Sequence, residues 1–294
     1  DRSAHRCEAG EPMNTGLKLF RFFKADWLGL LGAVLLVVLV FLGTAGPFLP
    51  LGDSEAIGAG PRLGAPSLAF LMGTDDLGRD YLPRVVEGIG STFLLSSIAV
   101  VITGVLGTLL GMLAGYLQGF ADSAITRVAD VLFAFPALLF GLLAAAVMGA
   151  GNIAAIVVIA TATLPLFIRV VRAATLSVAG REFVVAAVVS GASTWRVLLV
   201  HILPNVLGAA IIQLTYALSV GMLIESGLSF LGLGVQPPRA SLGSLLRLGS
   251  VYLNVAPSLV LIPGIVLALA IMSVNLLGDA IRDGLEPLRG RPLL

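Results

Sequence analysis

The chain has 294 residues, of which 57% are hydrophobic and only 12% are charged. Because an ordinary soluble domain carries about 25% charged residues, this composition excludes a soluble protein and indicates that lipid surrounds much of the chain. The net charge of +1, without a basic cluster, argues against nucleic-acid binding, and the single cysteine, Cys7, excludes an internal disulfide framework.

Residues 1–26 form an expected N-terminal cytoplasmic segment, in which residues 1–12 are polar and Met13 is a candidate natural start. The first apolar run begins near Trp27 and is too long for a cleavable signal peptide. Uncharged stretches that can hold a helix of about 20 residues across a hydrocarbon core of about 30 Å indicate the membrane spans. These stretches are 27–52, 88–121, 131–168, 197–224 and 248–278.

The third stretch, 131–168, would form a single helix of about 57 Å, which is too long for one crossing. Its middle, Met148–Asn152, is rich in glycine and carries a turn signal. We therefore divide this stretch and predict six transmembrane helices, the first of them at residues 27–50.

With six spans and the N-terminus inside, most of the 18 lysines and arginines lie on the inner side, whereas five spans would place most of them outside. Cytoplasmic loops carry an excess of Lys and Arg, so this distribution favours six spans and two cytoplasmic termini. The predicted organisation is an extracytoplasmic loop at 51–88, a five-helix domain at 89–290 with a long cytoplasmic loop at 173–204, and a tail at 291–294.

Eight residues of the outer loop, Gly73-Thr74-Asp75-Asp76-Leu77-Gly78-Arg79-Asp80, resemble the signature G-T-D-x-L-G-R-D. This signature is typical of the second permease, the DppC/OppC-like subunit, of dipeptide, oligopeptide and nickel ABC importers. Asp75, Asp76, Arg79 and Asp80 could cap and charge-pair a helix that begins near Asp80. The alternative is that they contact the solute pathway or the binding protein that delivers the substrate.

Glycines form a stripe in the second span. Gly107, Gly111 and Gly115 lie four residues apart, and Gly104 is close to the same face. Small residues at this spacing let helix backbones approach closely, so the stripe predicts a packing face. Lining of a passage is the alternative.

The inner loop contains Gly191, then nine residues, then His201-Ile202-Leu203-Pro204, which resembles the cytoplasmic EAA loop of ABC-importer permeases. The residues predict a short helix at 181–190, a turn at Gly191 with positive φ, and a second short helix that carries Trp195. Pro204 fits the first turn of the next span, because a proline there loses no helical hydrogen bond.

In that family, the loop docks into a cleft on the ATPase subunit, and the resemblance assigns this coupling to specific positions. They are Glu182, Ala186, Ala187, Gly191, Trp195, His201 and Pro204. Val185 stands where the motif has glutamate, which excludes a salt bridge from that position, although Glu182 could substitute. An interfacial amphipathic helix without a partner is the alternative.

Two later segments resemble the same family, so that the resemblance covers residues 68–290. Leu228–Pro238 is similar to S-F-L-G-L-G-V-Q-P-P, and Asn275–Pro287 is similar to the family's ending, with Glu286 where aspartate is usual. Three polar groups inside the spans could line the pathway or form interhelical hydrogen bonds. They are Gln213, Asn275 and Glu225, the last of which lies near the outer end of the fifth span.

The chain is identified as a member of this family, which implies an all-α, type I ABC importer permease fold in the bacterial cytoplasmic (inner) membrane. The resemblance also implies a heterodimer with a second related permease, two ATPase subunits that hold ATP and Mg, and an extracytoplasmic binding protein. Transport would proceed by alternating access. Di- or oligopeptides are the first expectation for the substrate, and nickel chelates, opines, glutathione or another small solute remain open.

No catalytic residue, cofactor or metal is expected on this chain. The only lysines, Lys18 and Lys24, do not follow a glycine, so the sequence has no P-loop, and His5 and His201 are too few for a metal cluster. A membrane-embedded enzyme lacks support, because neither G-x-S-x-G nor H-E-x-x-H occurs. A self-sufficient secondary transporter is the alternative from another class, although the span centres lack the paired ionisable groups typical of such proteins.

Overall fold

The computed structural model describes residues 27–285, so the predicted segments 1–26 and 291–294, with Glu286 and Pro287, lie outside the described residues. Between residues 27 and 285 the chain forms helices and no strand, apart from an isolated bridge between Thr74 and Asp80. The elements are α2 (Trp27–Ala45), η1 (Gly46–Phe48), α3 (Tyr81–Leu117), α4 (Gly119–Ala134), α5 (Ala137–Met148), α6 (Asn152–Ala179), α7 (Glu182–Val189), α8 (Thr194–Arg196), η2 (Val197–Ile202), α9 (Leu203–Phe230), α10 (Leu242–Val251) and α11 (Ser258–Leu285).

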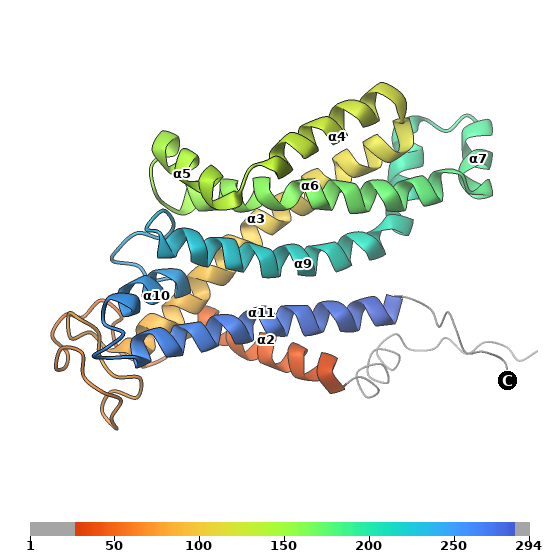
Figure 1. Cartoon of the computed structure of the whole chain (residues 1–294). Helices are drawn as coiled ribbons and strands as arrows, with labels where there is room; N and C mark the ends of the chain where they lie inside the picture. Colours follow the sequence, from red (N-terminus) through yellow and green to blue (C-terminus); the bar gives the residue numbers. More distant parts are fainter. Residues whose placement is uncertain (1–26, 286–294) are drawn as a thin grey trace, which may run out of the picture.

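The long helices run side by side between two ends of the molecule (Figure 1). One end holds the start of α2, helix α7 and the end of α11, and the opposite end holds α10 and the loop between η1 and α3 (Figure 1). Both ends of the described chain therefore lie on the same side as the 173–204 loop. Following the charge distribution, we name the α7 end the inner end and the α10 end the outer end.

Among residues 27–285, five helices are long and apolar enough to cross a membrane, and the pair α4 and α5, bent by 91°, makes a sixth if the two helices count as one span. The predicted turn at Met148–Asn152 is confirmed, since α5 ends and α6 begins there. The prediction did not include the bend. It occurs at Phe135, where the backbone is extended (φ −86°, ψ 124°), because the following Pro136 disfavours the helical conformation of the residue before it.

Several helix boundaries differ from the ends of the uncharged stretches, and two of these differences have a clear cause. The second span begins at Tyr81 instead of residue 88, because Arg84 and Glu87 lie inside α3, whereas the uncharged-stretch criterion excluded them. The fifth span is longer than 197–224, since Thr194–Phe230 is one continuous helix.

The glycine stripe forms a packing face, as predicted. A Cβ placed on Gly107, Gly111 or Gly115 would lie 2.6–2.7 Å from a side-chain atom of α6. Gly104 faces Leu214 of α9 instead. Because only hydrogen at these positions allows such close approach, the stripe fixes the contact between α3 and α6.

Helix α4 has little buried surface and is joined to α6 by two ion pairs. Asp122 pairs with Arg172 through two hydrogen bonds, and Asp130 pairs with Arg169, whose guanidinium also lies 4.9 Å from the Phe133 ring centroid. Ala129 is the only buried residue of α4. The two ion pairs therefore add to the packing contacts that α4 makes with α3 and α6.

Candidate functional site

The inner loop folds around its glycine as predicted. Helix α7 ends before Ser190, and Gly191 follows with a φ of +80°. A Cβ placed on Gly191 would meet no atom within 4 Å, so the backbone conformation, and not crowding, favours glycine here. The short helix and the turn that follows it are therefore confirmed.

The second half of this loop differs from the prediction. Helix α8 continues through the π-helix η2 into α9, so the second short helix is the first part of the span. The backbone N–H of Leu203 donates to the carbonyl of Leu198, five residues earlier. Pro204 lies in the first turn of α9 as expected. In a regular α-helix the proline ring would clash with the carbonyl four residues earlier, and the wider π-helical turn before Pro204 reduces this clash.

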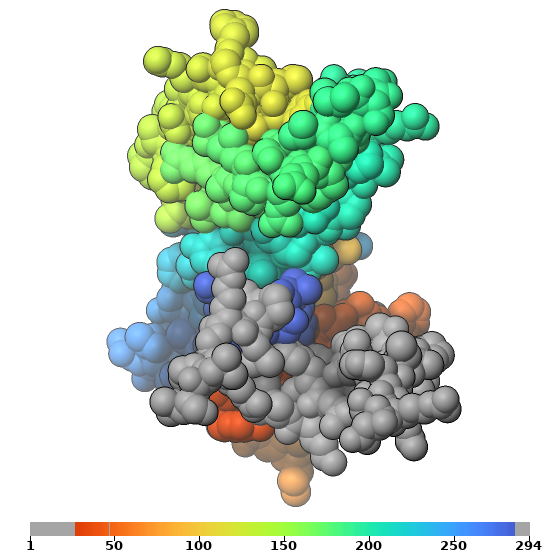
Figure 2. All heavy atoms as spheres, turned by 90° about the vertical axis from the view of Figure 1, so that its right-hand side faces the viewer, coloured from red at the N-terminus to blue at the C-terminus, as the bar shows by residue number. Residues whose placement is uncertain are grey.

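We name residues 181–204 the docking segment, because they present an apolar surface at the inner end. The outward-facing apolar side chains are Phe183, Val185, Val188, Val189, Trp195, Leu199 and Val200. Four buried side chains anchor the segment in a hydrophobic cluster with α3, α6 and α9, and these are Val184, Val197, Leu198 and Ile202. Figure 2 looks onto this end, where α7 stands at the surface beside the end of α6.

The structure brings the residues assigned to coupling together in this segment. Exposed members are Glu182, Ala186, Gly191, Trp195 and Pro204, and half-buried members are Ala187 and His201. Val185, in the position of the motif glutamate, is 51% exposed. The departure from the motif thus replaces a surface charge by a surface hydrophobic group.

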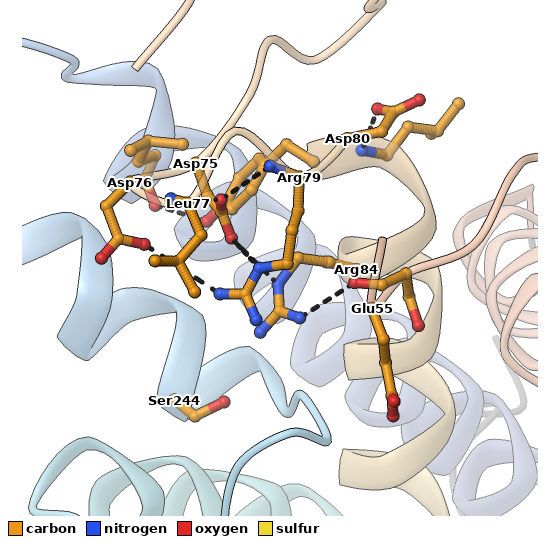
Figure 3. Close-up of polar contacts among 12 residues, drawn as sticks. Glu55, Asp75, Asp76, Leu77, Arg79, Asp80, Arg84 and Ser244 are labelled. Atoms are coloured by element: carbon orange, nitrogen blue, oxygen red, sulfur yellow. Dashed lines mark hydrogen bonds and ion pairs between the residues drawn. The ribbon is translucent and has the colours of Figure 1, made fainter. Parts of the chain in front are cut away.

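At the outer end, Asp75 and Arg79 of the 73–80 segment form an internal network with Arg84 (Figure 3). Asp75 is 0% exposed; its Oδ2 lies 2.6 Å from Nε of Arg79 and 3.5 Å from Nε of Arg84. Its Oδ1 accepts hydrogen bonds from the backbone N–H groups of Leu77 and Arg79. Asp75 therefore holds the turn that leads into α3.

Asp80 is the N-cap of α3, where its carboxylate accepts a hydrogen bond of 3.1 Å from the backbone N–H of Leu82. The capping and charge-pairing interpretation of this segment is therefore observed. Contact of Asp75, Asp76, Arg79 or Asp80 with a substrate or a binding protein stays a prediction.

Arg84 belongs to this network, although the sequence reasoning counted it only as a loop charge. It is 5% exposed, and its NH1 donates to the backbone carbonyl of Ser54 at 3.1 Å. The sequence held one indication that Arg84 belongs to the network, namely its position one helical turn after the capping residue Asp80. Its partner Asp75 could not be inferred from that place alone.

Glu225 is buried, at 0% exposure, in a network of hydroxyl groups. Thr92 Oγ1 of α3 donates to its Oε2 at 2.9 Å, and Ser229 Oγ donates to its Oε1 at 2.7 Å. Of the alternatives for this residue at the outer end of the fifth span, the structure shows interhelical hydrogen bonding, since α3 and α10 cover the carboxylate. In this conformation Glu225 does not face an open passage.

Two further polar residues lie inside spans. Gln213 of α9 is buried, whereas Asn275 of α11 is exposed on the surface of the chain. Ser219 Oγ donates to Asn275 Oδ1 at 2.6 Å, so α9 and α11 share an interhelical hydrogen bond. Lining of the pathway stays a prediction for Asn275 and for Gln213. Among residues 27–285, no three His, Cys, Asp or Glu side chains are grouped as a metal site would require.

Comparisons with known proteins agree with this architecture. The family model described as "Binding-protein-dependent transport system inner membrane component" matches residues 107–291. The chain is 39% identical to a di/tripeptide transport system permease protein, DppC, of Pseudomonas aeruginosa, over 74% of this chain and 72% of the relative. It is 33% identical to a dipeptide transport system permease protein, DppC, of Alkalihalophilus pseudofirmus, over 91% and 88% of the two chains.

A third relative, a glutathione transport system permease protein, GsiD, of Pectobacterium atrosepticum, is 32% identical over 92% of this chain and 90% of its own length. Among solved structures, the chain is similar to an inward-facing MetNI methionine ABC transporter, with a TM-score of 0.57 and 17% identity, over 68% of this chain and 95% of that chain. At this identity, the likeness concerns the fold.

Proposed function

The chain belongs to the family of binding-protein-dependent transport system inner membrane components, and on this premise we propose that it moves di- or oligopeptides across the bacterial inner membrane. It is a permease subunit of an ABC importer that works with a binding protein. Two relatives are named as transporters of dipeptides or tripeptides, and their similarity supports a peptide substrate for this chain. Because one relative is named for glutathione, another small solute stays open as the substrate, nickel chelates and opines included.

The exposed apolar surface of the docking segment carries the proposed coupling. Apolar side chains outside the lipid-facing spans are unfavourable in water unless a partner covers them. The segment is anchored by Val197, Leu198 and Ile202, each 0% exposed, so it is attached firmly to the bundle. A separate ATPase subunit, which holds ATP and Mg, would cover this surface.

The continuous helix from Thr194 to Phe230 supplies a direct connection from the docking segment to the outer end. Its 37 residues span about 55 Å, which is more than the thickness of the hydrocarbon core. A displacement of the docking segment would therefore move Glu225 and its neighbours at the far end of the same helix. This is the mechanical basis that we propose for alternating access.

In the proposed cycle, ATP binding closes a dimer of ATPase subunits, and the docking segments move with it. The helices then open outward to receive the substrate from the extracytoplasmic binding protein, and hydrolysis resets the inward-facing state. The energy for each change comes from differential binding of ATP and of the binding protein to the two states. This chain contributes packing and coupling, and the chemistry of hydrolysis belongs to the ATPase subunits.

A second related permease would complete the passage. Large apolar side chains lie exposed along α2, α4 and α5, where lipid or the second permease can cover them. Asn275 places a polar group on the exposed surface of α11, where its amide oxygen accepts a hydrogen bond from the buried Ser219 of α9. A heterodimer in which this surface faces the shared passage accounts for both features.

Affinity purification of the tagged chain from native membranes tests the proposal. We expect a second permease and ATPase subunits to be recovered with it, together with ATPase activity that its binding protein stimulates. Recovery of the chain alone, in a form that still moves solute, would support the self-sufficient secondary transporter instead.

A further inference from the structure

Four arginines line one cavity at the outer end, which we name the arginine pocket. It has a volume of about 410 Å³ and lies between the 76–84 segment, the 229–239 loop and α10. Its charged lining residues are Asp76, Arg79, Arg84, Arg239 and Arg247. The pocket therefore has four guanidinium groups and a single carboxylate on its walls.

The internal partners of these guanidinium groups are few. Arg79 and Arg84 share the carboxylate of Asp75, and their guanidinium groups lie next to each other on the side that faces Ser244 of α10 (Figure 3). Within residues 27–285, the side chains of Arg239 and Arg247 make no ion pair and no hydrogen bond. Asp75, together with Asp76 at 4.0 Å from Arg79, balances part of the charge of Arg79 and Arg84. The excess positive charge therefore comes from Arg239 and Arg247, and it favours an anionic occupant.

The shape of the pocket indicates where the occupant enters. Arg239 and Arg247 are exposed at the rim, whereas Ser229, Val235 and Leu245 are buried in its depth. An occupant that comes from the outer side therefore meets Arg239 and Arg247 first.

A second cavity of about 890 Å³ shares Arg239 with the arginine pocket and has the opposite charge. Its acidic lining residues are Asp53, Glu55 and Glu87. The outer face therefore presents a basic cavity directly beside an acidic one. Patterned charge of this kind favours a folded partner with the complementary pattern over a free anion, because it fixes both orientation and register.

We propose that the arginine pocket receives an acidic side chain of the extracytoplasmic binding protein when that protein docks. The inference rests on the proposed function, since it requires a binding protein that meets this face. The carboxylate accepts charge-assisted hydrogen bonds from Arg239 and Arg247 at the rim, and Arg79 and Arg84 add positive potential from below. The apolar walls, Leu77 and Leu248, pack against the methylene stem.

The test titrates the purified transporter complex, in nanodiscs of neutral lipid, with its binding protein and follows stimulated ATPase activity. For the Arg239→Gln/Arg247→Gln variant, we expect the half-saturating concentration of binding protein to rise at least about fivefold, with a weaker dependence on salt than the wild type. Arg62→Gln is the matched control, since Arg62 is an exposed outer arginine that does not line the pocket, and it should leave the concentration unchanged. Because Arg62 Nε donates to the backbone carbonyl of Asp76 at 2.7 Å, an equal Tm of this variant and the wild type is required for the comparison.

A charge exchange identifies the occupant. Arg247→Glu should weaken docking, and a lysine in place of one acidic residue on the binding protein should restore it. An unchanged half-saturating concentration in the double variant overturns the proposal, although the function stands. A change only in the substrate KM at saturating binding protein also overturns it and would assign the pocket to the substrate carboxylate. A change in the half-saturating concentration that occurs only in nanodiscs of anionic lipid overturns it as well. Absence of stimulation in the wild type removes the proposed function and this inference together.

Discussion

Thr92 Oγ1 of α3 donates a hydrogen bond of 2.9 Å to Glu225 Oε2 of α9, and the same hydroxyl accepts one of 3.2 Å from the backbone N–H of Leu242. One threonine thus joins the outer ends of α3, α9 and α10. Since α9 continues from the docking segment, this junction lies at the far end of the proposed connection between ATPase and outer face.

Glu225→Ala should destabilise the outer end, because it leaves the hydroxyls of Thr92, Ser226 and Ser229 without their buried acceptor. We expect a loss of about 2–4 kcal/mol in the free energy of unfolding, measured as a lower Tm of the purified complex. Glu225→Gln keeps the size and an acceptor oxygen and should cost less than half as much. Equal Tm values for wild type and Glu225→Ala would show that the junction does not contribute to stability.

Gly191→Ala should impair coupling, because a Cβ is strained at its φ of +80° by about 1–2 kcal/mol. Gly180→Ala is the matched control, since a Cβ there also meets no atom within 4 Å but the φ of Gly180 is −87°. Stimulated ATPase activity per recovered complex should fall for Gly191→Ala and stay near wild type for Gly180→Ala. A similar result for the two variants would contradict a role for the turn geometry.

Trp195→Ala should weaken the association with the ATPase subunit, because Trp195 is 55% exposed on the docking segment and large aromatic side chains dominate many interfaces. The expected loss is about 2–4 kcal/mol in binding, visible as ATPase subunits that dissociate on dilution. Trp27→Ala offers a control of the same residue type, because Trp27 is 70% exposed at the start of α2 and outside the docking segment. If Trp27→Ala releases the ATPase as readily as Trp195→Ala, the docking surface is misplaced.

Gly111→Ala should lower the Tm, because its Cβ would lie 2.9 Å from the backbone oxygen of Ile168 in α6, which cannot move as a side chain can. Overpacking of this kind costs about 1–3 kcal/mol. Gly208→Ala in α9 is the control, since its nearest neighbour, Leu285 Cδ1, lies 3.7 Å away at an ordinary contact distance. A tolerated Gly111→Ala would mean that α3 and α6 separate more easily than their packing indicates.

Arg172→Gln should loosen α4 more than Arg169→Gln does. The Arg172–Asp122 pair has two hydrogen bonds and side chains that are 32% and 19% exposed, whereas the Arg169–Asp130 pair is 43% and 60% exposed. We expect about 1 kcal/mol for the first and less for the second, read from protease susceptibility of the 118–136 region. The exchange Asp122→Arg/Arg172→Asp should recover part of the loss, and failure to recover any would assign the effect to size instead of charge.

Features with a local cause could be predicted from the sequence. The cap at Asp80, the turn at Gly191 and the break at Met148–Asn152 all follow from residues next to one another in the chain. The bend at Pro136 also has a local signal, because the residue before a proline avoids the helical conformation, but the count of uncharged residues did not use it.

Features that depend on distant partners could not be predicted. Burial of Glu225 requires Thr92, which is 133 residues away in the chain, and the start of α3 at Tyr81 requires partners that keep Arg84 satisfied inside the protein. Hydropathy treats each charged residue as a solvent-facing one. It therefore misplaces a residue whose countercharge or hydroxyl partner lies on another helix.

The most direct test of the account reconstitutes the chain with its partner permease and ATPase subunits in liposomes and follows uptake of a labelled dipeptide delivered by the binding protein. The account predicts uptake that requires ATP, the binding protein and the ATPase subunits, and that falls with Gly191→Ala. Uptake by this chain alone, without ATP, would contradict the account and make it a self-sufficient transporter.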